Sequence, residues 1–274
     1  MNQRNALSTR LAGLLGAALL GGLTACSHGG GGSSSAVGSG TVILYSLADM
    51  DGDWVGQLIP DNPTKPRRNF FVRVTGGSLV EGADSARSEW SLSDSLMSVS
   101  MSQDGDVEAV LSSLVATNAL DITGVMSFDK ESISGTFTYA GPAVLESQGT
   151  FELHRSTGPG HFDLDQIAGA WAGYGYNVLS NTRDLDLELD AAGAVLSGRF
   201  SRADGSTVHS YVPGSGSFAY FDDSVGRFQD VVLVADDGTI TTFQHLLVDE
   251  DGTLLGGFGH DSKLGNGIVE LWRP

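Results

Sequence analysis

A short acidic stretch has the spacing of a calcium-binding loop. DMDGD, Asp49–Asp53, places carboxylates at the first, third and fifth positions, where a Ca²⁺ loop carries oxygen ligands. Such a loop also needs Gly at its sixth position and Glu at its twelfth, but the chain has Trp54 and Pro60 there. We therefore expect an acidic turn that leads into a strand, and no metal site.

Histidine, serine and lysine add little further chemistry. No two histidines have the i,i+2 or i,i+4 spacing of zinc ligands, although His209, His245 and His260 could converge inside a barrel. SFDK, Ser127–Lys130, matches S-x-x-K, but that motif needs a helix and the pattern here is a strand that runs into a turn. We expect no catalytic residue, no metal and no cofactor, so an enzyme ranks third among the function classes.

The only cysteine, Cys26, follows an export signal. Arg4 and Arg10 give a positive start, and the apolar run Leu11–Leu23 is shorter than the ~20 residues that span a bilayer. The closing LTAC resembles the lipobox of bacterial lipoproteins. That resemblance implies cleavage before Cys26, a diacylglycerol on its sulfur and a fatty acyl chain such as palmitate on the new amine. Two or more chains would anchor the protein firmly.

These features predict the beginning of the domain plan. Residues 1–25 are expected to be a lipoprotein signal peptide, and residues 26–40 the lipidated Cys26 with a flexible Gly/Ser tether. The expected location is the bacterial cell envelope. Within the lipoprotein resemblance, Ser27 after the cysteine favours the outer membrane.

The charge balance excludes one class of partner. The chain has 33 acidic and 15 basic side chains, a net charge of −18, and would be repelled by nucleic acid and by anionic lipid headgroups. We therefore expect no nucleic-acid partner. KPRR, Lys65–Arg68, is the one basic cluster, and we expect a solvated loop there.

The sequence contains a hidden duplication. Two phrases match at a constant offset near the start of each copy, and two more match at nearly the same offset near the end. The matching stretches are LADMDGDWVG (47–56) with LDQIAGAWAG (164–173), and GTFELHR (149–155) with GIVELWR (267–273). The repeat predicts two copies of one domain, 41–156 and 161–274, joined at STGPG, Ser156–Gly160.

Within each copy the pattern is that of β-strands. Residues alternate in Asn69–Thr75 and in Asp184–Asp190, where Leu185, Leu187 and Leu189 share one face, so we expect one face buried and one exposed to water. Four Asp-Gly pairs predict hairpin turns, because Gly accepts a positive φ. They are Asp104-Gly105, Asp204-Gly205, Asp237-Gly238 and Asp251-Gly252.

A recurrent phrase, L-x-G-x-F, predicts strongly curved strands. Its three residues share one face, and Gly between bulky neighbours lets a sheet coil or another chain approach. The copies are Ile133-Gly135-Phe137, Leu196-Gly198-Phe200 and Leu254-Gly256-Phe258. The fold class is therefore all-β, with two tandem small antiparallel β-barrel or sandwich domains. We favour the barrel because closure removes exposed edges.

The pairing of G-x-W with a late Arg resembles the calycin group, which includes the lipocalins. The resemblance implies that each Trp closes a barrel end and that the Arg packs across it. The sets would be Gly52, Trp54 and Arg155 in the first copy and Gly169, Trp171 and Arg273 in the second. It also implies a short helical turn at Phe162–Gly169. The Gly-rich strands look like those of bacterial surface lipoproteins that bind host or metal-carrier proteins.

These patterns yield two functional hypotheses. Trp54, Trp171, Tyr174 and Tyr176 are the candidate ligand contacts, and the two tyrosines could line a mouth together with Phe218–Phe221. The first hypothesis is a membrane-anchored envelope lipoprotein that acts as a non-catalytic binding or structural module for an envelope protein or small ligand. The alternative is a lipocalin-like carrier of a small apolar ligand. An open or a packed barrel interior separates the two.

Overall fold

The computed structural model describes residues 43–86, 89–114, 116, 118–141, 145–177, 182–202 and 204–274. They belong to one compact unit, Val42–Pro274. Cys26 and the tether lie outside the described residues, so the assignments of residues 1–25 and 26–40 stay predictions. No helix in the described part of the chain is long and apolar enough to cross a membrane.

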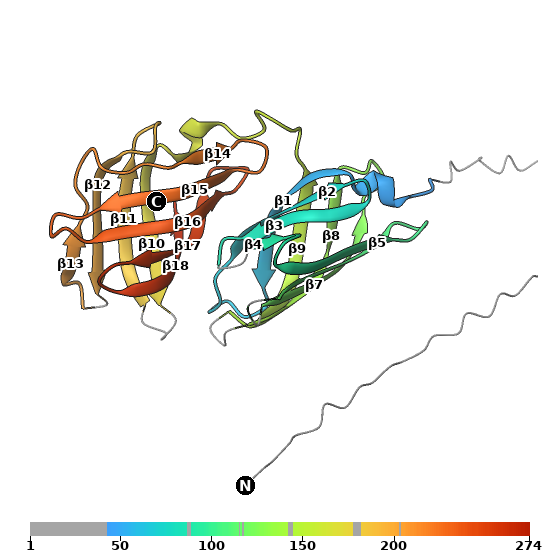
Figure 1. Cartoon of the computed structure of the whole chain (residues 1–274), viewed down its shortest axis with the longest axis horizontal. Helices are drawn as coiled ribbons and strands as arrows, with labels where there is room; N and C mark the ends of the chain where they lie inside the picture. The colour runs from blue at the N-terminus through green and yellow to red at the C-terminus, as the bar shows by residue number, and fades with distance from the viewer. Residues whose placement is uncertain are drawn as a thin grey trace, which may run out of the picture. The chain divides into compact units, whose positions relative to one another are not determined.

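The structure consists of two nine-stranded antiparallel sheets (Figure 1). The first sheet follows a short 3₁₀ helix, η1 (Leu47–Met50). Its strands are β1 (Gly52–Pro60), β2 (Arg68–Thr75), β3 (Ser78–Asp84), β4 (Glu89–Ser91), β5 (Ser95–Met101), β6 (Asp106–Ser113), β7 (Ala119–Met126), β8 (Ser132–Ala140) and β9 (Ser147–Arg155).

The second sheet repeats this plan after a second 3₁₀ helix, η2 (Leu164–Ile167). Its strands are β10 (Gly169–Asn177), β11 (Thr182–Leu189), β12 (Val195–Arg202), β13 (Thr207–Ser210), β14 (Tyr220–Asp222), β15 (Arg227–Val234), β16 (Ile240–Val248), β17 (Leu254–Asp261) and β18 (Gly265–Trp272). The helical turn expected at Phe162–Gly169 is therefore confirmed.

Each sheet is an up-and-down meander whose first and last strands pair. β1 pairs with β9 and β10 with β18, so each sheet curves back on itself. One sheet forms a nearly closed barrel and the other a half-barrel. In the second sheet, bridges from Tyr211 to Ala235 and from Ser217 to Val232 help to span the gap between the edge strands. The prediction of two small antiparallel barrels is confirmed.

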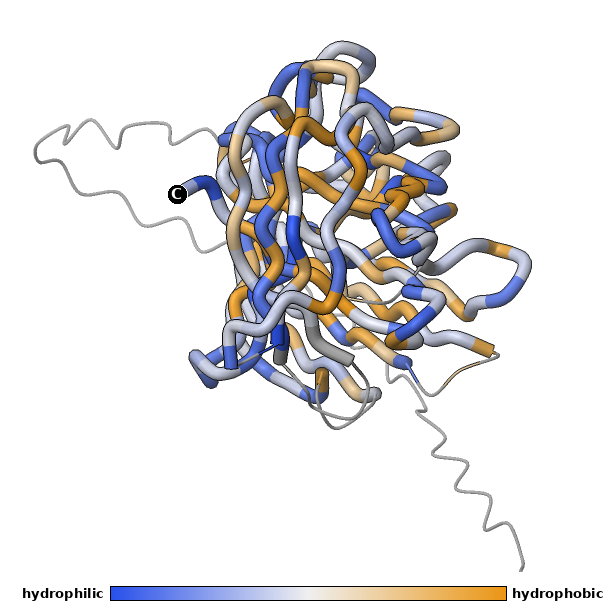
Figure 2. Tube along the Cα trace, turned by 90° about the vertical axis from the view of Figure 1, so that its left-hand side faces the viewer, coloured by the Kyte–Doolittle hydropathy of each residue, from blue (hydrophilic) through white to orange (hydrophobic). Residues whose placement is uncertain are grey.

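The strand periodicity explains how the barrel interiors fill. Leu185, Leu187 and Leu189 on β11 are buried as expected, while Asp184 and Glu188 between them are exposed. Figure 2 shows the same change between hydrophobic and hydrophilic positions along neighbouring strands. The buried face of each strand thus supplies the core.

β2 departs from the expected pattern of one buried and one wet face. Phe70 and Val72 belong to the core of the first barrel, whereas Phe71 is buried in the core around the second sheet. In return, Phe258 and Ile268 of the second sheet belong to the first core. The prediction of a wet face at Asn69–Thr75 was wrong because the second sheet covers it.

The L-x-G-x-F strands differ from one another. In β8, Ile133 and Phe137 are buried on one face, as expected. In β12, Leu196 is 50% exposed, because it is the extra residue of a bulge: Glu188 pairs with Ser197 and Leu189 with Val195, and Leu196 between them has no partner in the ladder. Its expected place on the same face as Phe200 was therefore wrong.

The third L-x-G-x-F strand lies at the contact between the sheets. A Cβ atom on Gly256 of β17 would lie 2.8 Å from Cβ of Ser85, which directly follows β3 of the first sheet. Nearby, the Asn69 amide donates hydrogen bonds to the carbonyls of Leu247 and Leu254 at 2.8 and 2.9 Å. The missing side chain at Gly256 therefore permits a close approach of the two sheets, one of the two roles expected for such a glycine.

The turn chemistry agrees with the sequence. All four Asp-Gly glycines have positive φ, between 63° at Gly252 and 91° at Gly105. The basic stretch Lys65–Arg68 does not form a wholly solvated loop, however. Arg68 begins β2 and is fully buried, with its guanidinium 4.2 Å from the centre of the Tyr139 ring and 3.7 Å from Asp84. The expectation of a solvated cluster was wrong because strand alternation turns Arg68 inward.

The close approach at Gly256 predicts a measurable coupling. Gly256→Ala should lower the free energy of unfolding by roughly 1–3 kcal/mol, because the added methyl overpacks against Ser85. Ser85→Gly removes that obstacle, so the double variant should recover most of the loss after the cost of Ser85→Gly alone is subtracted. Urea unfolding of the four proteins measures this. A double variant in which the two losses simply add would show that the Ser85 contact is not the cause.

Candidate functional site

The first barrel is closed at one end by Trp54 and Arg155. The indole is fully buried, and its Nε1–H donates to the carbonyl of Met50 at 2.7 Å. The Arg155 guanidinium lies 4.3 Å from the ring centre and donates to the carbonyls of Asp49, Asp51 and Lys130. Since η1 ends here, its last carbonyls find donors in Arg155. The cation also gains from the face of the indole.

The second barrel repeats this arrangement. Trp171 Nε1–H donates to Ile167 at 2.7 Å, and the Arg273 guanidinium lies 4.6 Å from the Trp171 ring centre. Arg273 donates to the carbonyls of Ala168, Gln166 and Gly252. Both Trp–Arg pairings implied by the calycin resemblance are confirmed.

Short sequence signals build each closure. η1 begins with a capping box, in which the side chains of Ser46 and Asp49 each accept a hydrogen bond from the backbone N–H of the other residue. Asp163 and Gln166 form the same arrangement at the start of η2. Gly52 follows η1 with φ of 127°, and a Cβ there would lie 3.2 Å from Arg155 Nη1. Glycine is required because the backbone turns sharply under the guanidinium.

The four predicted ligand contacts occupy different surroundings. Trp54 and Trp171 are 0% and 1% exposed, so a ligand reaches them only if the closure opens. Tyr174 is 43% exposed on β10, edge-on to Trp272 with ring centres 5.9 Å apart. Tyr176 lies in β10, but its side chain is outside the described residues. Ligand binding by these residues stays a prediction.

Tyr174 does not share a mouth with Phe218–Phe221, because it lies on the exposed face of β10 against Trp272. Phe218 and Phe221 both pack on Phe228, at 5.3 and 4.4 Å between ring centres. Phe218 also lies beside Ile167, at the end closed by Trp171, and both phenylalanines pack against the core of the second barrel. They therefore lie inside the barrel, whereas Tyr174 lies on its outer face.

The carboxylates of DMDGD do not converge. Asp49 accepts from Lys130 Nζ at 2.8 Å, and this hydrogen bond is the main reason that its pKa is lowered. Asp51 accepts from the backbone of Gly77 at 2.7 Å, and Asp53 binds Arg73 at 2.6 Å. Each carboxylate therefore serves a turn or an ion pair, as the mismatched calcium motif indicates.

The three histidines that could converge are separate. His209 is buried beside Asp261, with Nε2 3.5 Å from Oδ2. His245 is buried where the sheets meet and contacts the carbonyl of Asp84 at 2.8 Å, while His260 is exposed and bonds to Asn266. Among the residues that the structure describes, no group of three or more His, Cys, Asp or Glu side chains could hold a metal ion.

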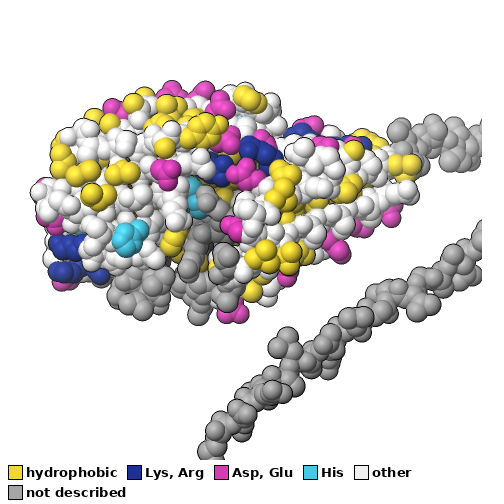
Figure 3. Space-filling view, in the orientation of Figure 1, with side chains coloured by type: hydrophobic (Ala, Val, Ile, Leu, Met, Phe, Trp, Pro, Cys, Tyr) yellow, Lys and Arg dark blue, Asp and Glu magenta, His cyan; other side chains and the backbone are white. Residues whose placement is uncertain are grey.

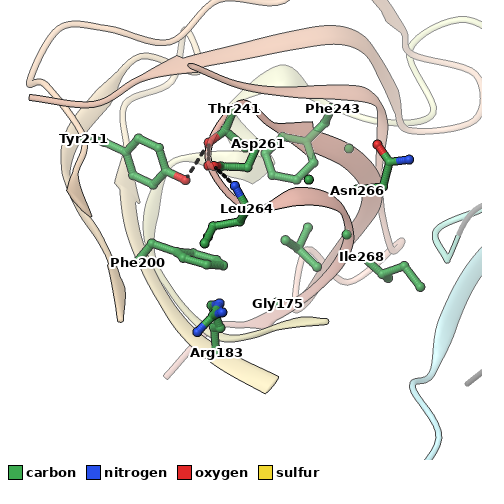
Figure 4. A pocket seen from close by; sticks show the side chains of 14 residues that line it. Gly175, Arg183, Phe200, Tyr211, Thr241, Phe243, Asp261, Leu264, Asn266 and Ile268 are labelled. Atoms are coloured by element: carbon green, nitrogen blue, oxygen red, sulfur yellow. Dashed lines mark hydrogen bonds between the residues drawn. The ribbon is translucent and has the colours of Figure 1, made fainter. Parts of the chain in front are cut away.

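Sequence reasoning missed a cavity in the second barrel (Figure 4). Its volume is about 40 Å³. Phe200, Phe243, Leu264 and Ile268 supply apolar walls, and Arg183 lies in the same lining. The phase of β11 could have revealed Arg183, because it precedes the inward-facing leucines by two residues.

A hydrogen-bonded chain forms the polar side of this cavity. The Tyr211 hydroxyl lies 3.1 Å from Thr241 Oγ1, which donates to Asp261 Oδ2 at 2.6 Å. Asp261 Oδ1 accepts from the backbone N–H groups of Lys263 and Leu264. Burial raises the pKa of Tyr211, so its hydroxyl stays protonated near neutral pH.

Charged side chains join the two sheets. Arg73 of β2 binds Asp53 at 2.6 Å, Glu81 at 2.8 Å and Asp222 at 3.1 Å, and Arg227 of β15 binds Glu81 at 2.7 Å. Burial alone would raise the pKa of Asp222, but hydrogen bonds from Ser224 and Arg73 lower it overall. The ionised form is thus favoured at the contact.

Glu270 of β18 is the titrating group of this contact. It is 4% exposed and accepts from the Arg67 backbone N–H at 3.0 Å. Burial raises its pKa to about 7, although Arg67 and Arg68 act in the opposite direction. The contact between the sheets therefore changes its charge near neutral pH.

No protein-family model matches this chain, and no curated protein is significantly similar to it.

Arg155→Gln should open the first closure. The variant loses the cation over Trp54 and donors to three carbonyls, so the free energy of unfolding should fall by roughly 2–4 kcal/mol. Trp54 should also become more accessible to water, which moves the fluorescence emission to longer wavelength. Arg199→Gln is the control, because Arg199 forms an exposed ion pair with Asp186 and should cost under about 0.5 kcal/mol. Equal stability of both variants would contradict the structural role of Arg155.

Glu270→Gln should change how stability depends on pH. The folded-state pKa, about 7, lies above the usual 4.5, so ionised Glu270 destabilises the fold above pH 7 and the penalty disappears below pH 4.5. The variant should be more stable than the parent at pH 8, by roughly 1–3 kcal/mol, and nearly equal to it at pH 4. Thermal unfolding across this range measures the difference. Glu108→Gln, at an exposed position, is the control and should show no such pH-dependent difference. If the stability difference between Glu270→Gln and the parent did not change with pH either, the assignment would be refuted.

Proposed function

We propose that this protein is a lipid-anchored lipoprotein of the bacterial envelope that binds another molecule without transforming it. Cys26 would carry the lipid, and the Gly/Ser segment after it would hold the two barrels away from the outer membrane. The partner would be an envelope protein or a small ligand. No cofactor other than the covalent lipid is required.

The packed interior of the first barrel carries the proposal. Trp54, Trp90, Phe70, Leu111 and Tyr139 are each at most 2% exposed and belong to one core. A barrel filled in this way presents its outer surface and its loops for recognition, whereas a carrier needs an enclosed space for its cargo. The contacts between the sheets also support a rigid surface that loses little entropy on binding.

The charge distribution favours recognition by contact rather than attraction to nucleic acid or anionic lipid. Figure 3 shows acidic side chains spread over the face in view, with basic side chains gathered at fewer places. With 33 acidic and 15 basic residues, a partner of neutral or positive surface charge would approach without repulsion.

The carrier hypothesis stays an alternative because the second barrel has a cavity. At about 40 Å³ it is far smaller than the roughly 300–1,000 Å³ of typical ligand pockets. A carrier should retain an apolar molecule through purification, and native mass spectrometry of the whole protein would reveal that added mass. The binding module should instead have the mass of the acylated chain alone.

The anchoring half of the proposal has a direct test. Cells that express the full chain and grow with an alkyne-tagged fatty acid should yield a labelled protein in the outer-membrane fraction. The Cys26→Ser variant should not be labelled and should be absent from the outer-membrane fraction. Its signal peptide should either remain attached or be cleaved at a different position. Ser27→Ala is the matched control and should keep the label. The proposal would be wrong if the unsubstituted protein carried no label and its mature N-terminus were not acylated.

A further inference from the structure

We propose that the cavity of the second barrel is a binding site for a short apolar carboxylate, with Arg183 holding the carboxylate and the apolar walls holding the hydrocarbon. The carboxylate would come either from a free small acid or from the carboxyl-terminal Val or Leu of a partner chain. This inference rests on the proposed binding function for its biological role. Occupation of the cavity can be tested independently.

Arg183 has an unusual position for a cation. It has the phase of Leu185 and Leu187 on β11 and so faces the barrel interior, where it is half-buried. It forms no ion pair or hydrogen bond with the side chains that the structure describes. By contrast, five other arginines in the described part of the chain lie within 4 Å of a carboxylate, namely Arg68, Arg73, Arg155, Arg199 and Arg227.

A second arginine strengthens the positive charge at this rim. Arg202 lies directly opposite Arg183 in the ladder between β11 and β12. Like charges at directly opposed positions destabilise a sheet, and an anion between them would relieve the repulsion. Asp204 interacts with Arg202 from the adjoining turn, whereas Arg183 has no hydrogen-bond or ion-pair partner among the described side chains.

The remaining polar groups of the cavity favour an anion over a cation. Asp261 is the carboxylate in the lining, but both of its oxygens accept hydrogen bonds, from Thr241 and from two backbone N–H groups. Its oxygens are therefore largely occupied as acceptors. Among the described side chains of the lining, the groups that can still donate are Arg183 and the amide nitrogen of Asn266, whose oxygen bonds to His260.

The size of the cavity limits the hydrocarbon. A volume of about 40 Å³ holds about three water-sized groups, at roughly 10–15 Å³ each. An isopropyl group has this size, whereas a lipid chain or a sugar ring does not. Phe200 and Phe243 form apolar walls, and Figure 4 shows Arg183 beside Phe200. A branched acid such as 3-methylbutanoate combines both requirements.

The test uses the purified mature protein, in whichever N-terminal form it is recovered. Saturation-transfer NMR should show binding of 3-methylbutanoate and none of the neutral 3-methylbutanamide. Arg183→Gln should lower the affinity for the acid at least tenfold, since a charge-assisted hydrogen bond contributes roughly 1.5–3 kcal/mol. Arg199→Gln, which removes an outward-facing arginine of β12, should leave binding unchanged.

A second variant and a peptide pair complete the test. Leu264→Phe should fill the cavity and abolish binding while Arg183 is intact, and thermal unfolding checks that each variant is folded. An acetylated peptide ending in Val-COO⁻ should compete with the acid if the source is a chain terminus, and its C-terminal amide should not; competition by the acid alone identifies a free small ligand. Binding that survives both Arg183→Gln and Leu264→Phe, or no binding of either probe, would overturn the proposal whether or not Cys26 is acylated.

Discussion

The stacking of a guanidinium on a buried indole holds each half of this structure together. Arg155 and Arg273 stand at the end of the last strand of each sheet and reach across to the 3₁₀ turn before the first strand. That contact fixes where the first and last strands meet, and the remaining strands follow as a meander. The cation satisfies carbonyls that a short helix leaves without donors, and the indole below excludes water. The same contact performs both tasks in each of the two sheets.

The contact between the sheets imposes a different constraint. The outer face of β2 is covered by the second sheet, and a polar network crosses the contact or supports it, formed by buried Asn69, Asp84 and Arg227 and by the half-buried Arg73. Buried charges add little net stability, because their desolvation offsets their attraction. Their geometry does define one arrangement of the two sheets, since a shift of one sheet against the other would leave these buried charges without partners. The two copies thereby become one body, and Glu270 links their contact to pH.

The chemistry that first attracts attention in the sequence serves the fold. Asp49 caps η1 and binds Lys130, Asp51 accepts a hydrogen bond from the turn at Gly77, and Asp53 pairs with Arg73. The histidines lie apart from one another. What remains for recognition is the outer surface and the small cavity beside Arg183. Among the described residues that line the cavity, Tyr211, Thr241 and Asp261 are hydrogen-bonded to one another, which leaves Arg183 and the amide nitrogen of Asn266 as the donors on which the proposed carboxylate site depends.

The sequence by itself determined the local features: the strands, the Asp-Gly turns, the repeat, and the pairing of Trp54 with Arg155. These depend on periodicity, on turn propensities or on short motifs that both copies carry, so they can be read along the chain. Tertiary structure decided the rest. The covered face of β2, the inward Arg68, the exposed Leu196 and the cavity at Arg183 depend on which strands meet and in what register. Such contacts join residues far apart in the chain, and alternation within one strand gives two faces without saying what lies against either.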